Sequence, residues 1–414
     1  MTDGSSRGQR AAYGKHRPVN QKLRRGVNFT LRRIARPVRR GEVTGLVFHP
    51  PVTSDAELAD LVARINWYLP GVDLPIYVPG SEGRQVRPED APHMDASLVH
   101  TRRLAPAAPG GPGVRVVLHR TTPRSLLTGW RGLRRTTVAD AFLSYTSEHG
   151  YRRLREALST VPVPDARASV ETLLRRRADG GTALVLGTGP SASELDDETL
   201  ARSDVRIICN SAVRNEELLD RLRPSAICFG DPVFHYGPSA YAAQFRRDLL
   251  AAVERTGALV VTPANFLQLL LGHHPELADR VVGLANDGEQ WQWPTPEAPQ
   301  VKPSGNILTE MMMPVGFALA DTVLVAGCDG RASTENYFWK HNPAVQYDPV
   351  LMGAVFEAHP SFFAARSYAD YYERHCERVE AFAQVAEARG KRLEGVTRSW
   401  IPALVQRGAP TFTE

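Results

Sequence analysis

The sequence predicts an α/β fold: a mostly parallel β-sheet with helices on both faces, preceded by a smaller α/β region. Two observations from residue 180 onward support this. Short apolar segments rich in β-branched residues alternate with longer segments of helical spacing. The apolar segments also lack an alternation of polar and apolar residues, which is typical of strands that helices bury on both faces.

Composition limits the class of protein. The chain has 414 residues, which suits two domains, and 43% of them are hydrophobic, which is enough for a sizeable core. No apolar run approaches the roughly 18 residues of a membrane helix, and the N-terminus lacks the apolar core of a secretion signal. The four cysteines are scattered without a C-x-x-C pair, so we expect a cytoplasmic protein without disulfides or a zinc knuckle.

Residues 1–42 form a basic arm. Residues 1–40 contain twelve arginines and lysines and one acidic residue, so the rest of the chain carries a net negative charge. The first 20 residues have a composition typical of disorder. Residues 20–40 place Leu23, Val27, Leu31 and Ile34 at helical spacing among arginines. Such a segment is a solvated arm, or it binds an anionic membrane surface or a nucleic acid. Of these partners we expect the inner face of the cell membrane and no nucleic acid.

Residues 43–160 are predicted to form the small α/β region. Residues 43–50, 74–79 and 114–120 have strand patterns, whereas residues 54–69 and 138–158 have helical patterns. No motif that carries chemistry stands out in this region. It either binds an acceptor or packs against the second domain, and the segment 160–166 is a plausible hinge between the two.

Residues 167–410 are predicted to form the main domain. Strands are expected at residues 182–187, 205–210, 225–230, 258–263 and 322–327, with helices between them and right-handed crossovers. In such sheets, ligands bind outside the carboxyl ends of the strands. The residues that follow each strand are therefore the candidate site.

The first strand ends in Gly187-Thr188-Gly189-Pro190-Ser191. The two glycines allow a sharp turn and a close approach of the backbone to a ligand, and Pro190 fits the first turn of a helix. Ser191 and Ser193 could cap that helix or donate to an oxygen, and a free helix N-terminus attracts phosphate. A third glycine and a Gly-Lys-Ser/Thr sequence are absent, so this is neither a dinucleotide fingerprint nor a Walker A loop. The alternative is a tight turn without a ligand.

Other strand ends carry polar residues. Asn210 ends the second strand, and its amide could read a ribose or a pyrimidine, or simply make a turn, as could Asn215. Asp231 follows the third strand, where an Asx turn is the alternative. Ser304 is a predicted N-cap, Gly305 removes bulk beside it, and the strand after that helix ends at Asp329.

The order of these motifs resembles the bacterial sialyltransferase family that modifies lipooligosaccharides. The resemblance covers roughly residues 180–405. The matching positions are Gly187 to Ser191, Asn210, Ser304, Gly305, Gly327 and Asp329. It implies a single Rossmann-like nucleotide-binding domain, a variant of the GT-A type. Two departures are Asp231, where the family has asparagine, and Arg331, which replaces the nearer of two tyrosines that contact the donor phosphate. The farther tyrosine matches Tyr337.

The resemblance also implies a histidine as general base, shortly before the last helix. His359 and His375 are the two candidates. We favour His359 because we expect it in a loop, from which it could reach a pocket, whereas we expect His375 inside a helix. The distance to the strand at residues 391–396 slightly favours His375.

The implied activity is transfer of a nonulosonic sugar from a CMP-sugar to a glycan or lipid-linked acceptor hydroxyl, with inversion. Beyond the CMP-sugar co-substrate we expect no cofactor, and no metal, because the chain contains no Asp-x-Asp. The Gly-x-Gly-Pro-Ser opening is also similar to motility-associated glycosyltransferases and to pterin diphosphokinases, which would need ATP and magnesium. A non-catalytic nucleotide-binding scaffold is a further alternative.

Overall fold

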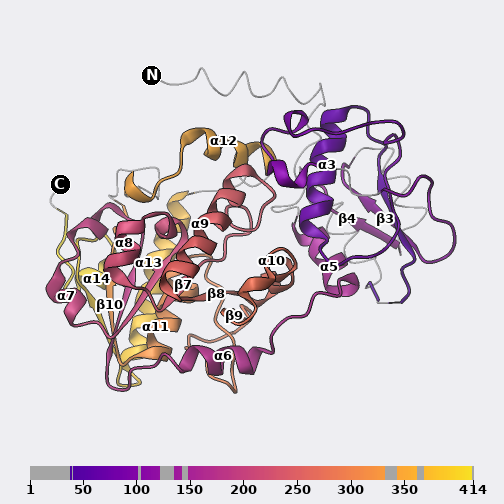
Figure 1. The fold of residues 1–414 in the computed structure, drawn as a ribbon. Coiled ribbons are helices and arrows are strands. Elements are labelled where there is room, and N and C mark those ends of the chain that lie inside the picture. The colour runs from indigo at the N-terminus through magenta and orange to yellow at the C-terminus, as the bar shows by residue number, and fades with distance from the viewer. Residues whose placement is uncertain are drawn as a thin grey trace.

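A computed structural model describes residues 38–39, 41–100, 104–121, 135–141, 148–331, 343–360 and 368–412. Most of the basic arm and Tyr337 lie outside these residues. The described chain contains two parallel sheets flanked by helices (Figure 1), which confirms the predicted α/β fold. Among the described residues, no helix is both long enough and apolar enough to cross a bilayer.

The N-terminal region, residues 43–160, contains a sheet with the strand order β2-β1-β3-β4. Its elements are β1 (Gly45–His49), α3 (Asp55–Tyr68), β2 (Ile76–Tyr77), β3 (Val114–Leu118), β4 (Thr136–Val138) and α5 (Glu148–Leu158). Ser54 caps α3 by accepting a hydrogen bond from the Glu57 amide. The helix predicted over residues 138–158 is wrong at its start. The β-branched residues Thr136, Thr137 and Val138 form a strand, and the described part of α5 runs from Glu148 to Leu158.

The main domain contains a sheet with the order β11-β10-β5-β6-β7-β8-β9, and every described strand pairing in it is parallel. The strands are β5 (Thr182–Leu186), β6 (Val205–Cys209), β7 (Ala226–Cys228), β8 (Leu259–Pro263), β9 (Val281–Leu284), β10 (Thr322–Ala326) and β11 (Arg392–Gly395). The sequence analysis did not identify β9, a short strand at the edge of the sheet.

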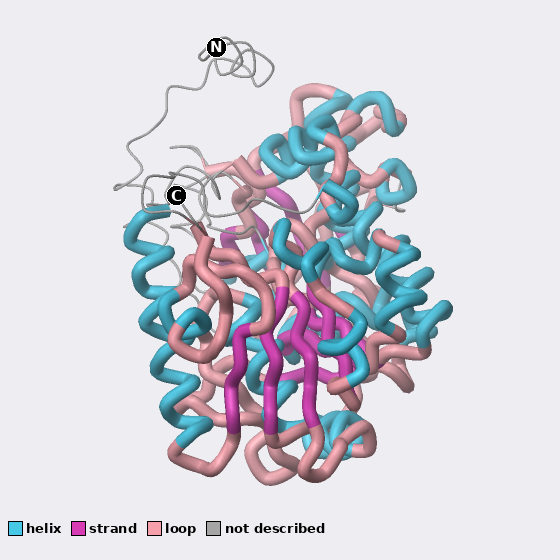
Figure 2. Tube along the Cα trace, turned by 90° about the vertical axis from the view of Figure 1, so that its left-hand side faces the viewer, coloured by secondary structure: helices cyan, strands magenta, loops and turns pink. Residues whose placement is uncertain are grey.

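The helices of this domain cover both faces of the sheet (Figure 2). They are α6 (Ala166–Leu174), α7 (Asp197–Ala201), α8 (Glu216–Leu222), α9 (Ala240–Thr256), α10 (Leu267–His273), α11 (Met313–Leu319), α12 (Pro349–Ala358), α13 (Tyr368–Glu387) and α14 (Pro402–Val405). In β5, Leu184 and Leu186 join a core with residues of α8, α9 and α10. Ala183 and Val185 join the opposite core, with residues of α6, α11 and α13. Strand β5 is therefore buried on both sides, as its unbroken apolar pattern predicts.

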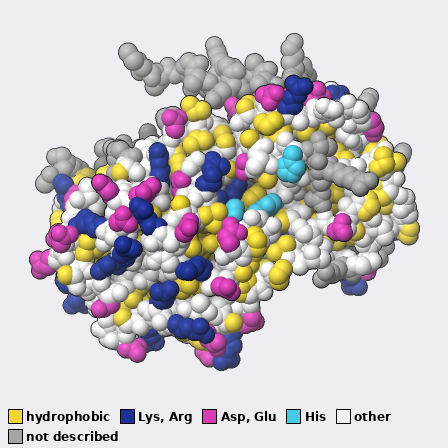
Figure 3. Space-filling model, in the orientation of Figure 1, with side chains coloured by type: hydrophobic (Ala, Val, Ile, Leu, Met, Phe, Trp, Pro, Cys, Tyr) yellow, Lys and Arg dark blue, Asp and Glu magenta, His cyan; other side chains and the backbone are white. Residues whose placement is uncertain are grey.

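The N-terminal region packs on the main domain through α3. The indole Nε1 of Trp67 donates to the Tyr236 carbonyl at 2.8 Å, and its ring stacks on His273 at a centroid distance of 4.3 Å. The guanidinium of Arg246 lies 3.7 Å from the centre of the Trp67 ring. In Figure 3, histidine side chains gather on the surface where α10 meets this region. One continuous hydrophobic core joins the two parts, so packing against the main domain is one role of the N-terminal region.

The topology locates the crevice in which such folds bind ligands. The crossovers from β5 to β9 carry α7, α8, α9 and α10 on one face, whereas α11 and α13 lead into β10 and β11 on the other face. The connections therefore change face between the neighbouring strands β5 and β10. This switch point is where ligands bind in open parallel sheets.

Candidate functional site

The loops after β5 and β10 meet at the switch point. The Gly187 amide donates to the Ala326 carbonyl and the Gly189 amide donates to the Gly327 carbonyl, both at 2.8 Å. A Cβ on Gly189 would lie 2.2 Å from Oδ2 of Asp329. The glycines of the opening motif are thus required for the two loops to pack on each other.

Asp329 binds an amide of the segment in which the sequence suggests a phosphate site. Both of its carboxylate oxygens lie 3.0 Å from the Ser191 amide nitrogen, which donates to them. Burial raises the pKa of Asp329 above its usual value, although the hydrogen bonds from Ser191 oppose the shift. The expectation that Ser191 caps an α-helix is wrong, because residues Pro190–Glu194 form a short 3₁₀ turn, η4. The Ser191 hydroxyl is buried against the Thr397 hydroxyl at 3.1 Å.

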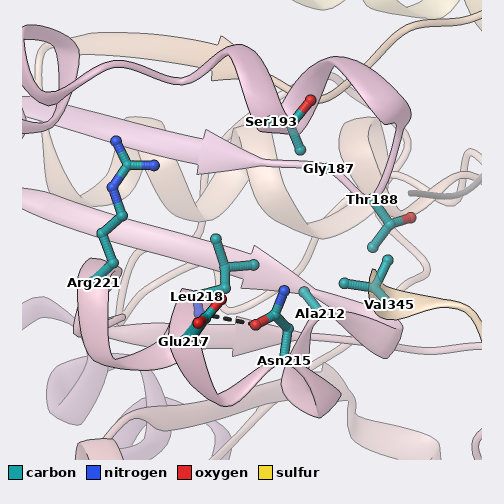
Figure 4. Close-up of a pocket in the computed structure, with 10 residues that line it drawn as sticks. Gly187, Thr188, Ser193, Ala212, Asn215, Glu217, Leu218, Arg221 and Val345 are labelled. Carbon is teal, nitrogen blue, oxygen red and sulfur yellow. Dashed lines mark hydrogen bonds between the residues drawn. The ribbon is translucent and has the colours of Figure 1, made fainter. Parts of the chain in front are cut away.

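A cavity of about 210 Å³ lies beside this junction, at the carboxyl ends of β5 and β6 (Figure 4). Its walls come from the loop after β5, from η4, from the 3₁₀ turn η5 (Asn210–Arg214), from α8 and from the turn η9 (Pro343–Val345). The lining residues are Gly187, Thr188, Ala192, Ser193, Ala212, Asn215, Glu217, Leu218, Arg221 and Val345. Apolar groups and a few polar side chains share the walls, as in small-molecule sites.

Asn215 is a hydrogen-bond donor at the cavity. Its Oδ1 accepts from the Leu218 amide at 3.0 Å and so caps α8. This bond fixes the amide orientation and turns Nδ2 away from the helix, toward the cavity (Figure 4). The turn-making role and the ligand-facing role, which the sequence presents as alternatives, are compatible in this one side chain.

Asn210 adopts a strained backbone at the end of β6. Its φ of 49° is rare for a residue other than glycine. Its Oδ1 is buried and has no hydrogen-bond partner among the described residues. Strained backbone and unsatisfied polar atoms concentrate at functional sites. Asn210 does not line the cavity itself, but it begins the turn η5, which supplies Ala212 to the cavity wall.

Asp231 makes the turn that the sequence suggests as the alternative to ligand binding. Its Oδ1 accepts from the amides of Val233 at 2.8 Å and Phe234 at 3.0 Å. The Asp231 amide donates to Nδ1 of His235 at 3.0 Å. The side chain thus organises the loop after β7.

The helix after Gly305 begins later than predicted. Ser304 is not an N-cap, because the helical turns follow Ile307, with the π-helical residues Leu308–Met312 leading directly into α11. Glu310 instead reaches back, and its Oε2 accepts from the amides of Ser304 at 3.0 Å and Gly305 at 2.6 Å. Gly305 has a φ of +67°, a left-handed conformation that glycine adopts more easily than other residues.

Helix α13 brings His375 to the Ser304–Gly305 turn. The Tyr371 hydroxyl donates to the Gly305 carbonyl, and Arg378 donates to the Ser304 carbonyl. His375 lies between these two residues on the same helix face, because positions separated by three or four residues are neighbours on a helix. Burial, with a smaller effect of Arg378, lowers the pKa of His375 to about 3. The imidazole is therefore neutral at pH 7, but so low a pKa also makes it a weak proton acceptor in this state.

Arg331 lies near the same helix. Its guanidinium carbon is 5.0 Å from the centre of the Tyr372 ring, and its backbone amide donates to the Tyr372 hydroxyl at 3.3 Å. The Ser304–Gly305 turn and Arg331 thus both lie against residues in the first half of α13, the helix that carries His375.

His359 lies outside the helices, between α12 and α13, as expected, but it is buried, so our reason for favouring it, free access to a pocket, is wrong. It is the C-cap residue of α12 and only 2% exposed. Neither ring nitrogen has a hydrogen-bond partner among the described residues, and burial lowers its pKa to about 3. A Cβ on Gly237 would lie 2.5 Å from its Nε2, so the ring is packed against that loop. Helix α12, about 15 Å long, separates His359 from Val345 at the cavity.

Sequence reasoning named Ser193 as a possible donor but missed Glu217, Arg221 and Val345 as residues of the cavity wall. Glu217 and Arg221 could have been found, because they follow strand β6 closely. Arg221 donates to Oδ1 of Asp197 at 2.7 Å and to the Leu195 carbonyl at 2.8 Å, which ties α8 to the chain after η4. Val345 carries no local signal, since it comes more than 100 residues later in the chain.

A comparison of the chain with models of protein families and with curated protein sequences finds no match. Within the described ranges, His, Cys, Asp and Glu side chains form no group of three or more that could hold a metal ion.

Proposed function

We propose that the protein is an inverting glycosyltransferase that uses a CMP-activated nonulosonic sugar. The observation that carries the proposal is the cavity at the carboxyl ends of β5 and β6, with the Nδ2 donor of Asn215 directed toward it. Its volume suits a nucleoside-sized group and is below the range of drug-sized ligands. The motif order described above supports CMP as the nucleotide.

In the proposed reaction, the acceptor hydroxyl attacks the anomeric carbon, the bond from that carbon to the phosphate oxygen breaks, and CMP leaves. The acceptor proton passes to a neutral histidine. His375 is better placed than His359 because it lies on the helix that contacts the Ser304–Gly305 turn and Arg331. The Arg331 guanidinium and, outside the described residues, the Tyr337 hydroxyl would stabilise the leaving phosphate.

The acceptor is proposed to be a glycan or lipid-linked glycan at the inner face of the cell membrane. The sequence of the arm supports this location, since arginines surround an apolar stripe in residues 20–40. We propose no metal and no cofactor beyond the CMP-sugar.

Calorimetric titration with CMP, CDP, UDP, GDP and ATP, each with EDTA or with magnesium, tests the proposal. We expect selective binding of CMP in EDTA. Binding of ATP only with magnesium would instead support the diphosphokinase alternative, and no binding of any nucleotide would contradict a nucleotide site.

The substitution Asn215→Asp separates ligand binding from folding. Aspartate keeps the oxygen that caps α8 but replaces the NH₂ donor, so we expect nearly unchanged stability and at least tenfold weaker CMP binding. Asp165→Asn is the matched control, because Asp165 caps α6 in the same way and does not line the cavity. Equal CMP affinity in wild type and Asn215→Asp would contradict the assignment of Asn215 to the binding site.

A further inference from the structure

The α12 segment, residues 343–360, connects the cavity to the N-terminal region. Val345 lines the cavity at one end of this segment. Near that end, the Tyr347 hydroxyl donates to Oδ2 of Asp248 at 2.6 Å, and Asp348 caps α12. At the other end, Ala358 and His359 lie against α3 of the N-terminal region.

Apolar side chains bury α12 only in part, through Leu351, Val355 and Ala358. Val355 and Ala358 are its buried residues among those whose side chains are described, whereas Val350 is 81% exposed and Phe356 is 43% exposed. A short helix with this little buried surface depends on contacts at its ends for a fixed position.

The contact at the C-terminal end comes from Arg64 of α3. Its Nη2 donates to the Ala358 carbonyl at 2.8 Å, and the side chain is almost completely buried. Asp60, one turn earlier in α3, fixes the guanidinium through two hydrogen bonds, from Nε at 2.7 Å and from Nη2 at 3.1 Å. This paired geometry leaves the guanidinium little freedom, so the position of Ala358 is well defined.

His93 adds a second connection to the same end of α12. Its Nε2 lies 3.0 Å from Oδ1 of Asp60, and its Nδ1 lies 3.7 Å from Oε2 of Glu357. Ala358 of α12 is thus hydrogen-bonded to a polar cluster of the N-terminal region, and the half-exposed carboxylate of Glu357 lies close to the same cluster.

We propose that Arg64 is a positioning residue for the ligand cavity. By holding the end of α12, the N-terminal region keeps the whole α12 segment, including the wall at Val345, in the position that binds the nucleotide. The inference deepens the proposed function, on which its binding measurement rests. It gives residues 43–160 a role in ligand affinity beyond packing.

The test compares Arg64→Met with Arg155→Met. Arg155 is an equally buried arginine of the N-terminal region; it pairs with Glu148 at 3.1 Å and donates to the Tyr68 carbonyl at 3.2 Å, away from α12. Hydrogen exchange of the full-length protein, without ligand, should be at least tenfold faster in the α12 segment of Arg64→Met. In Arg155→Met this segment should exchange as in wild type.

Titration with CMP supplies the second measurement. We expect at least fivefold weaker binding in Arg64→Met, unchanged affinity in Arg155→Met, and partial recovery in Arg64→Lys, which keeps one cationic donor. If wild type does not bind CMP, the proposed function fails, while the exchange data still decide whether Arg64 anchors α12. Unchanged exchange in Arg64→Met, or faster exchange with unchanged CMP affinity, would overturn the positioning role.

If Arg64→Met does not fold, Glu357→Gln provides the same test. The Glu357 carboxylate is half exposed, so its neutral replacement removes the negative charge beside His93 without burying an unpaired charge. A smaller increase in exchange, confined to the α12 segment, is then expected, and its absence would count against the anchor.

Discussion

Substitution of Gly189 by alanine tests the junction between the loops after β5 and β10. The added methyl would lie 2.2 Å from Oδ2 of Asp329 and 2.8 Å from the Gly327 carbonyl oxygen, and carbon atoms do not approach oxygen so closely. The Asp329 side chain must therefore move, and Ser191 loses its charged acceptor.

The magnitude follows from these contacts. Loss of a hydrogen bond to a charged group costs about 1.5–3 kcal/mol, and overpacking adds about 1–3 kcal/mol. Alanine also lowers the conformational entropy of the unfolded chain, which offsets about 0.4–1 kcal/mol of the destabilisation. We expect Gly189→Ala to lower the free energy of unfolding by about 3 kcal/mol in urea denaturation. Gly353→Ala is the control, because no atom lies within 4 Å of the added methyl.

A double-mutant cycle with Asp329→Ala identifies the cause. Asp329→Ala alone loses the same hydrogen bonds, but in the double mutant the carboxylate no longer meets the methyl, and only the contact with Gly327 remains. The two effects should therefore be non-additive by about 2 kcal/mol, well beyond the ~0.5 kcal/mol found for independent sites. Additive effects would refute the packing of Gly189 on Asp329.

The remaining predictions concern pH and the arm. Burial lowers the pKa of His235 to about 3 and that of His273 to about 4, so both are neutral in the folded protein at pH 5.5. The unfolded chain takes up protons as the pH falls below about 6.5, so stability is lost there, by about 1.4 kcal/mol per histidine at pH 5.5. Urea denaturation at pH 7.5 and 5.5 measures this, and equal stability would contradict it. Deletion of residues 1–40 should lower binding to anionic liposomes in a sedimentation assay and leave turnover on a soluble acceptor intact; loss of folding would contradict this division of roles.

The sequence predicts the main sheet well because its strands are short, apolar on both sides and followed by turn residues. The pattern in residues 182–187 gives β5 and its buried position directly. The sequence predicts secondary structure less well where a strand directly precedes a segment with helical spacing. Residues 136–138 belong to a strand, although the helical spacing that follows them extends back to Val138.

The site could be predicted only in part, because contacts with residues distant in the sequence decide which polar groups remain available to a ligand. The Gly-x-Gly-Pro-Ser segment does lie at the switch point, but its Ser191 amide binds Asp329, which is 138 residues away in the sequence. Similarly, no local pattern distinguishes the buried His359 from a loop histidine, since Arg64 and Gly237 determine its surroundings. Asn215 is an exception, because its cavity position could be predicted from local sequence. It caps α8 and lies shortly after β6, at the edge of the sheet where ligands bind.

A crystal structure of the protein with CMP is the most direct test of the account. We predict the nucleotide in the cavity between η4 and α8, within hydrogen-bond distance of Nδ2 of Asn215, with the phosphate directed toward Gly305, Arg331 and His375. CMP bound outside this cavity, or an empty cavity at saturating CMP, would contradict the proposed function.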